Sequence, residues 1–119
     1  MSNPLALIVE DDRDSARLYR RILEPTGVDS EIVYTSDSAL TWLEKSVPDF
    51  VLLDLRLDDD DSGADILQEI RSDERMSKTR VIIITAYSKL ADDLEAAVET
   101  VIIKPVKIKQ LRELIADLI

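Results

Sequence analysis

The stretch FVLLDLRLDDDDSG, residues 50–63, decides how the rest of the sequence is interpreted. Its first half is a short apolar run, and such runs are typical of a β-strand that is buried on both faces of a parallel sheet. The run carries one aspartate near its end, Asp54, and four more aspartates crowd the following loop. A carboxylate at the end of a buried strand can cap a helix or perform chemistry, and the other segments decide between these interpretations.

Four more short apolar runs follow the same pattern, and they alternate with segments whose apolar residues recur at a spacing near 3.6. With 50–55, the predicted strands are 5–9, 31–34, 80–85 and 101–103. The predicted helices carry Ala16, Tyr19, Ile22 and Leu23; Leu40 and Leu43 after a Ser36 cap; Ile66, Leu67 and Ile70 after Gly63; Leu90, Leu94 and Val98; and Ile108, Leu111, Leu114, Ile115 and Leu118. This order predicts an α/β fold, a (βα)5 doubly wound parallel sheet of five strands with helices on both faces.

Length and composition limit the function. The 119 residues predict one domain, 1–119, and no apolar run approaches the length of a membrane helix. The sequence has no cysteine and no histidine, which excludes thiol and imidazole catalysis. A formal charge of −10 argues against direct nucleic-acid binding, because phosphates attract basic surfaces. The N-terminal residues do not resemble a signal peptide, so we expect a cytoplasmic protein with no membrane partner.

The predicted strands deliver reactive side chains to one edge of the sheet, where open α/β sheets bind their ligands. In chain order these residues are Glu10 and Asp11, Asp54, Thr85, and Lys104. Three carboxylates this close together repel, so either their pKa values rise or a divalent cation lies among them. Oxygen ligands with open positions suit Mg²⁺. Such a cation, with an ammonium and a hydroxyl, could hold a phosphoryl group against Asp54.

The motifs LIVEDD, VLLDL, IIITA and IIKP, in this order, resemble the receiver domain of two-component response regulators over essentially the whole chain. The resemblance implies the flavodoxin-like strand order 2-1-3-4-5 and a cis peptide bond between Lys104 and Pro105. It implies that Asp54 accepts a phosphoryl group that Thr85 and Lys104 contact. Mg²⁺ would be held by Glu10, Asp11, Asp54 and the backbone carbonyl of Arg56.

The resemblance also implies a signalling module that is not an enzyme, beyond catalysing its own phosphorylation and dephosphorylation. The implied partner is a histidine kinase or a phosphotransfer protein, and phosphorylation would switch the conformation to control a partner or an output domain. A homodimer could form through the fourth helix, fifth strand and fifth helix. One departure is Val101, which stands where the family tends to place an aromatic switch residue.

Two other functions compete with this interpretation. Residues 58–69 match a calcium-loop pattern through Asp58, Asp60, Ser62, Gly63 and Glu69, although an EF-hand needs a helix where this sequence predicts a strand. Phosphatases of the haloacid-dehalogenase type also use a nucleophilic aspartate with Mg²⁺ and a lysine. They require a second aspartate two residues after the nucleophile, and Arg56 occupies that position.

Overall fold

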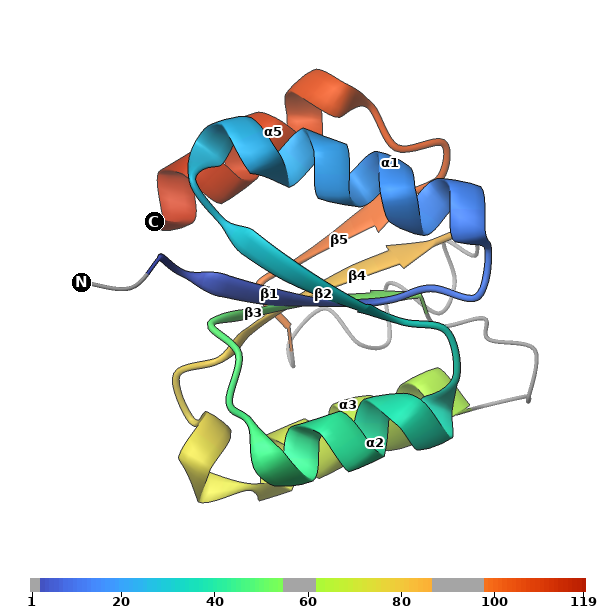
Figure 1. Ribbon diagram of the computed structural model, residues 1–119, viewed down its shortest axis with the longest axis vertical. Coiled ribbons are helices and arrows are strands. Elements are labelled where there is room, and N and C mark those ends of the chain that lie inside the picture. The colour runs from blue at the N-terminus through green and yellow to red at the C-terminus, as the bar shows by residue number, and fades with distance from the viewer. Residues whose placement is uncertain (1–2, 55–61, 87–97) are drawn as a thin grey trace.

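The computed structural model describes residues 3–54, 62–86 and 98–119, and within them the chain forms one five-stranded parallel sheet (Figure 1). The strand order is β2-β1-β3-β4-β5, as the resemblance implies. The bounds are β1 Leu5–Val9, β2 Asp29–Val33, β3 Phe50–Asp54, β4 Arg80–Thr85 and β5 Thr100–Ile103. All pairings between neighbouring strands are parallel, so every strand ends at the same edge, on the right in Figure 1. The predicted fold class is confirmed.

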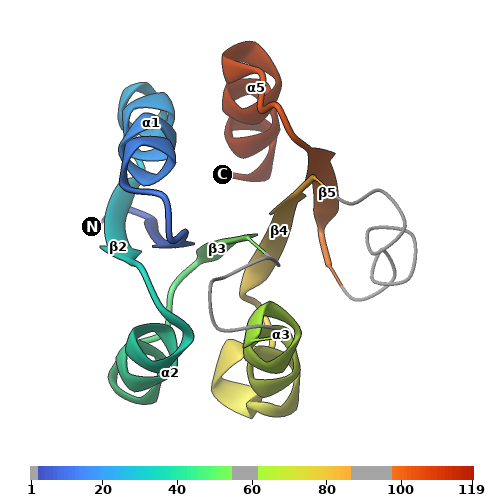
Figure 2. The ribbon, with the colours of Figure 1, turned by 90° about the vertical axis from the view of Figure 1, so that its right-hand side faces the viewer.

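In the described part of the chain, helices cover both faces of this sheet (Figure 2). The described helices are α1 Arg13–Leu23, α2 Ser36–Lys45, α3 Ser62–Ser72 and α5 Ile108–Leu118, with short 3-10 turns at Glu24–Thr26 and Glu74–Met76. Helices α1 and α5 lie together on one face, and α2 and α3 lie together on the other. No helix in the described ranges is long and apolar enough to cross a membrane.

The core divides into two layers because successive residues of a strand point to opposite faces. In β4, Ile82 and Ile84 pack toward α1 and α5, whereas Val81 and Ile83 pack toward α2 and α3. The central strands β1, β3 and β4 are therefore apolar on both faces, as the sequence predicts. Each layer seals one side of the sheet, so the strand ends are held in fixed positions relative to one another.

The two outer strands do not follow the prediction of burial on both faces. Strand β2 alternates between exposed and half-buried residues, and Ile103 at the end of β5 is 43% exposed. The reason is their position, because an outer strand has a neighbouring strand on one side alone. A short apolar run such as EIVY does not reveal whether its strand is central or at an edge.

Helix starts are partly as predicted. Asp12 accepts a hydrogen bond from the Ser15 amide and caps α1, as expected of an acid beside the positive end of a helix dipole. The cap of α2 is Thr35 and not Ser36, which is the first helical residue. Gly63 lies inside the first turn of α3 and does not precede it. For the predicted fourth helix, Leu90 and Leu94 are outside the described residues, while Val98 packs against the layer under α2 and α3.

The core predicts a clear contrast between two isoleucines. Ile82→Ala should lower the free energy of unfolding by about 2–5 kcal/mol, because the fully buried side chain leaves a cavity between β4 and the α1/α5 layer. Ile108→Ala removes the same atoms from a side chain that is 49% exposed and should cost less than about 1 kcal/mol. Urea unfolding followed by circular dichroism measures both values, and equal costs would contradict the layered core.

Candidate functional site

The carboxyl edge of the sheet collects the side chains that the sequence predicts for the site. Asp54 is the last residue of β3 and Thr85 the last of β4, and the register pairs Asp54 with Ile84, next to Thr85. Glu10 follows β1 directly, and Lys104 follows β5. The backbone amide of Lys104 donates to the carbonyl of Thr85 at 2.8 Å, which joins the ends of β5 and β4.

Three carboxylates form a cluster at this edge. Oxygen atoms of Glu10, Asp11 and Asp54, one from each side chain, all lie within 4.8 Å of one another. Glu10 is 1% exposed and Asp54 is 4% exposed, whereas Asp11 is half-buried. A cluster of acids this buried is rarely a solvated surface, because burial of a charge without a partner is costly.

Lys104 supplies the positive charge for the cluster. Its ammonium nitrogen lies 3.2 Å from Oε1 of Glu10 and 3.1 Å from Oδ2 of Asp54, so one cation pairs with two buried acids. The pKa of Lys104 is raised to about 12: burial lowers it, but the hydrogen bond and charge of Asp54, with the charge of Glu10, outweigh that effect. The lysine is therefore charged across the physiological range.

One ammonium does not balance three carboxylates, and Glu10 shows the consequence. The pKa of Glu10 is raised to about 8, first because burial disfavours its charge, and then because Asp54 hydrogen-bonds and repels it. The charge of Lys104 acts in the opposite direction and does not cancel these effects. The sequence allows two outcomes for crowded carboxylates, a retained proton or a bound cation. Both have a physical basis at this site.

The other predicted features have separate outcomes. The peptide bond between Lys104 and Pro105 is cis, as the resemblance implies. Thr85 is completely buried. Arg56, whose carbonyl is a predicted metal ligand, lies outside the described residues, as do Asp58 and Asp60 of the calcium-loop pattern.

Helix α3 argues against a calcium loop. It spans Ser62–Ser72, so positions 5 to 12 of the pattern, from Ser62 to Glu69, are helical and cannot wrap around a cation as a loop would. A strand, β3, stands where the pattern needs an entering helix.

Tyr19 joins the site although its sequence pattern marks it as a core residue of α1. Its hydroxyl donates a hydrogen bond to Oε1 of Glu10 at 3.4 Å, and its ring packs in the α1/α5 layer. The pKa of Tyr19 is raised to about 12 by burial and then by the charge of Glu10, so the hydroxyl keeps its proton. A tyrosine among aliphatic residues at helical spacing carries a polar group that must find a partner when buried, and this is the signal that could have identified it.

A parallel α/β sheet with buried acids and a lysine at the ends of β1, β3 and β5 is the arrangement of a receiver domain, and comparisons with known proteins agree. The family model of the response regulator receiver domain matches residues 6–116. The chain belongs to this family, whose members are signalling modules of two-component systems.

Similar proteins come from bacteria and archaea. The regulatory protein LuxO of Vibrio vulnificus is 35% identical over 108 residues, which are 88% of this chain and 23% of that protein. FilR2 of Methanothrix harundinacea, a methanogenesis regulatory protein, is 32% identical, with 96% of this chain and 80% of that protein covered. The solved signal receiver domain of a LuxO repressor protein from Vibrio parahaemolyticus is 31% identical with a TM-score of 0.85, covering 98% of this chain and 89% of that one. The chain thus spans less than a quarter of the length of the LuxO relatives it matches.

The raised pKa of Glu10 predicts how stability depends on pH without metal. The folded value of about 8 exceeds the ordinary 4.5, so the folded protein holds a proton that the unfolded chain releases, and stability falls as pH rises from 4.5 toward 8. In EDTA, Glu10→Gln removes this penalty. Its stability relative to the wild type should therefore rise by roughly 2–4 kcal/mol from about pH 5 to about pH 8.

Urea unfolding at several pH values measures this difference. Glu113→Gln, at an exposed position on α5, is the matched control and should follow the wild type. A Glu10→Gln curve parallel to the wild type at all pH values would mean that Glu10 is ionised as easily in the folded protein as in the unfolded chain.

Proposed function

We propose that the domain, residues 1–119, accepts a phosphoryl group on Asp54 from a histidine kinase or a phosphotransfer protein. The observation that carries this proposal is the position of Asp54, at the end of a central strand with its carboxylate paired to Lys104 and beside two further acids. In the transfer, a carboxylate oxygen of Asp54 attacks phosphorus as the bond between phosphorus and the donor imidazole nitrogen breaks. The imidazole leaves with the bonding electron pair, and Asp54 becomes an acyl phosphate.

Lys104 and Thr85 are suited to contact the transferred group. Thr85 ends β4, which pairs with β3, and Lys104 follows β5, which pairs with β4. The backbone amide of Lys104 donates to the Thr85 carbonyl and holds the two residues in a fixed relation. The Lys104 ammonium already donates a hydrogen bond to Asp54, so it can pair with an oxygen of the incoming phosphoryl group without a large movement. We propose that the Thr85 hydroxyl donates to a second oxygen, which offsets negative charge that the transfer concentrates near three acids.

The donor set fits Mg²⁺. The cluster offers oxygen atoms alone, and a hard divalent cation prefers carboxylate, carbonyl and water ligands. Glu10, Asp11 and Asp54 would hold it, with the Arg56 carbonyl as a fourth ligand. When bound, the cation would supply positive charge to the carboxylates and to the phosphoryl oxygens. The chain itself contributes the fixed, largely buried acids and the lysine that keeps two of them together.

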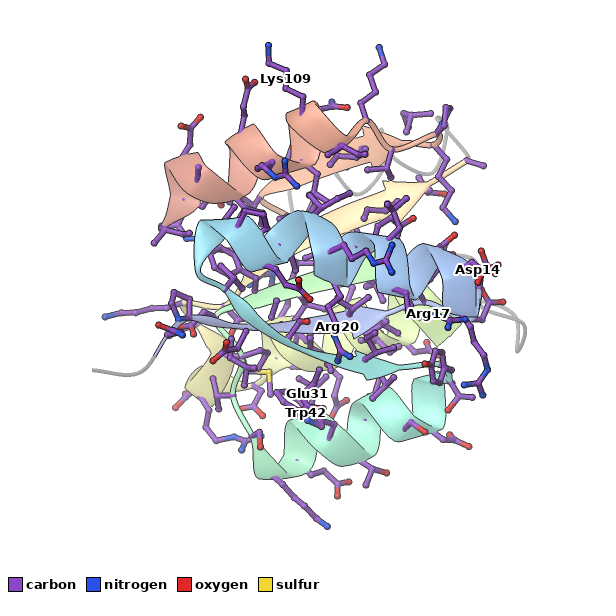
Figure 3. All side chains as sticks on the ribbon, turned by 45° about the horizontal axis from the view of Figure 1, so that its top comes forward. Asp14, Arg17, Arg20, Glu31, Trp42 and Lys109 are labelled. Atoms are coloured by element: carbon purple, nitrogen blue, oxygen red, sulfur yellow. The ribbon has the colours of Figure 1, made fainter. Side chains whose placement is uncertain are left out.

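The first turns of α1 are suited to meet the phosphodonor partner. The helix begins at Arg13, two residues after Asp11, so a protein that reaches Asp54 approaches this end of it. Arg13 and Arg17 are exposed there beside the exposed acids Asp12 and Asp14, and Figure 3 shows Arg17 beside Asp14, with which it forms an ion pair at 3.2 Å. A surface of mixed charge can pair with charges of both signs on a partner.

A second protein-binding face is proposed along β5 and α5, where a second copy of the chain could bind. Ile103 is 43% exposed and Ile108 is 49% exposed, and Lys107 and Lys109 beside them are exposed as well. An apolar centre with a charged rim is typical of protein interfaces. The acidic residues that the sequence adds to this face, Asp92, Asp93 and Glu95, lie outside the described residues.

The acceptor assignment predicts that one residue carries the label. With Mg²⁺ and a small phosphodonor such as acetyl phosphate, the wild type should be modified at Asp54, because this carboxylate ends the central strand β3 and pairs with Lys104. Reduction with borohydride followed by mass spectrometry locates the acyl phosphate. Asp54→Asn should abolish the label, and Asp117→Asn, an exposed control on α5, should retain it. Label that survives Asp54→Asn would sink the assignment.

The metal proposal predicts a loss of affinity when either neighbouring acid becomes neutral. Glu10→Gln and Asp11→Asn should each weaken Mg²⁺ binding about tenfold or more, since each removes one charge from the cluster that the cation relieves. Isothermal titration calorimetry measures the dissociation constants directly. Glu113→Gln and Asp117→Asn are the matched neutralisations on α5 and should bind as the wild type does. Equal affinities in all five proteins would remove Glu10 and Asp11 from the site.

A further inference from the structure

Tyr19 is a buried polar group for which the proposed phosphoryl transfer has no role. It is 4% exposed, it lies on α1, and its ring is part of the α1/α5 layer. Among the described residues, its hydroxyl has Glu10 as its hydrogen-bond partner, at 3.4 Å from Oε1. The helix that covers the sheet thus reaches into the acidic cluster with one neutral donor.

The two oxygens of the Glu10 carboxylate are held differently. Oε1 accepts from the Tyr19 hydroxyl at 3.4 Å and from the Lys104 ammonium at 3.2 Å. Oε2 accepts from the backbone amide of Asp12, next to the start of α1, at 3.4 Å. Tyr19 and Lys104 therefore fix one oxygen from the interior side, and the carboxylate group is oriented as a whole.

We propose that Tyr19 is a positioning residue of the cation site, which acts by holding Oε1 of Glu10 so that the other oxygen is presented to the cation. This inference rests on the proposed function, since it concerns the same site and the same Mg²⁺. Tyr19 itself does not touch the cation or the phosphoryl group. Its role is to restrict the orientation of the Glu10 carboxylate, which would bind the cation.

The need for such a residue follows from the length of glutamate. Glu10 has one more rotatable bond than an aspartate at the same position, so its carboxylate has more orientations to lose when a cation binds. A hydrogen bond from a side chain that is locked in the core removes that freedom before binding, as outer partners of metal ligands commonly do. Tyr19 is suited to this because its ring is packed between α1 and the sheet.

The second reason is that Lys104 cannot serve Glu10 alone. Its ammonium also pairs with Asp54, and under the proposed function it turns to the phosphoryl oxygens once Asp54 is modified. A hydroxyl has no net charge and is not drawn to the phosphoryl group. Tyr19 therefore keeps Oε1 in place whatever Lys104 contacts.

The test is a double-mutant cycle on Mg²⁺ affinity by calorimetry, with the metal alone as ligand. Tyr19→Phe keeps the ring and removes the hydroxyl, and it should weaken binding about tenfold. Glu10→Asp keeps the charge but is one methylene shorter, so its carboxylate no longer reaches the hydroxyl. In the Glu10→Asp background, Tyr19→Phe should change the affinity by less than about twofold, because the contact it removes is already absent.

Tyr34→Phe is the matched control. Tyr34 packs against the same core layer, and its ring centroid lies 4.1 Å from the Arg13 guanidinium carbon. It should bind Mg²⁺ as the wild type does. Urea unfolding of the metal-free variants shows whether either substitution lowers the stability of the fold. A general loss of stability would not depend on which residue occupies position 10.

Each outcome decides the inference. A tenfold loss in Tyr19→Phe that disappears with Glu10→Asp supports it. Wild-type affinity in Tyr19→Phe, or the same loss in both backgrounds, overturns it while leaving the metal site of the proposed function intact. Absence of Mg²⁺ binding by the wild type overturns the metal site and the inference together.

Discussion

The site depends on the pairing of one ammonium group, that of Lys104 at the edge of the sheet, with two buried carboxylates. Lys104 comes from the end of β5, while Glu10 and Asp54 come from the ends of β1 and β3, so the pairs join three of the five strands at one edge. Two acids that are almost fully buried would repel each other and lose hydration if the lysine were absent. The parallel sheet makes this arrangement possible, because it brings residues far apart in the chain to a common edge at a spacing that backbone hydrogen bonds fix.

The same cluster of acids lowers the stability of the metal-free folded protein. The pKa of Glu10 is raised to about 8, first by burial and then by the hydrogen bond and charge of Asp54, and the charge of Lys104 does not cancel these effects. Added positive charge stabilises such a site. A divalent cation that binds there supplies this stabilisation, whereas the metal-free chain folds without it. Local destabilisation of this kind is common where a protein is built to bind or react. The apolar layers on both faces of β1, β3 and β4 provide the stability that tolerates it.

Much of this could be predicted from the sequence because the alternation of strand and helix segments and the side-chain periodicity within each segment are strong local signals. The five apolar runs became the five strands within two residues, and each predicted site residue in the described ranges lies at the carboxyl edge. What failed depended on local backbone geometry or on contacts across the fold. Whether Thr35 or Ser36 caps α2 depends on backbone geometry, since both side chains can accept the hydrogen bond. Tyr19 was assigned to the core by its spacing, correctly, but the direction of its hydroxyl depends on how α1 lies over β1.

Transmission of a signal from this site is limited by what Val101 can do. Its β-branched side chain is half-buried and packs toward the layer under α2 and α3, in register with Ile83, so it has no ring to exchange between two positions. The backbone offers another route, since the Lys104 amide donates to the Thr85 carbonyl at 2.8 Å. A group that draws the Lys104 ammonium away from Glu10 and Asp54 acts on the same residue whose amide holds the end of β4. A ligand shifts a conformational equilibrium only through its differential affinity for the two states. Within the described part of the chain, Lys104 and Thr85 are suited to supply that difference, because Val101 contributes no aromatic contact.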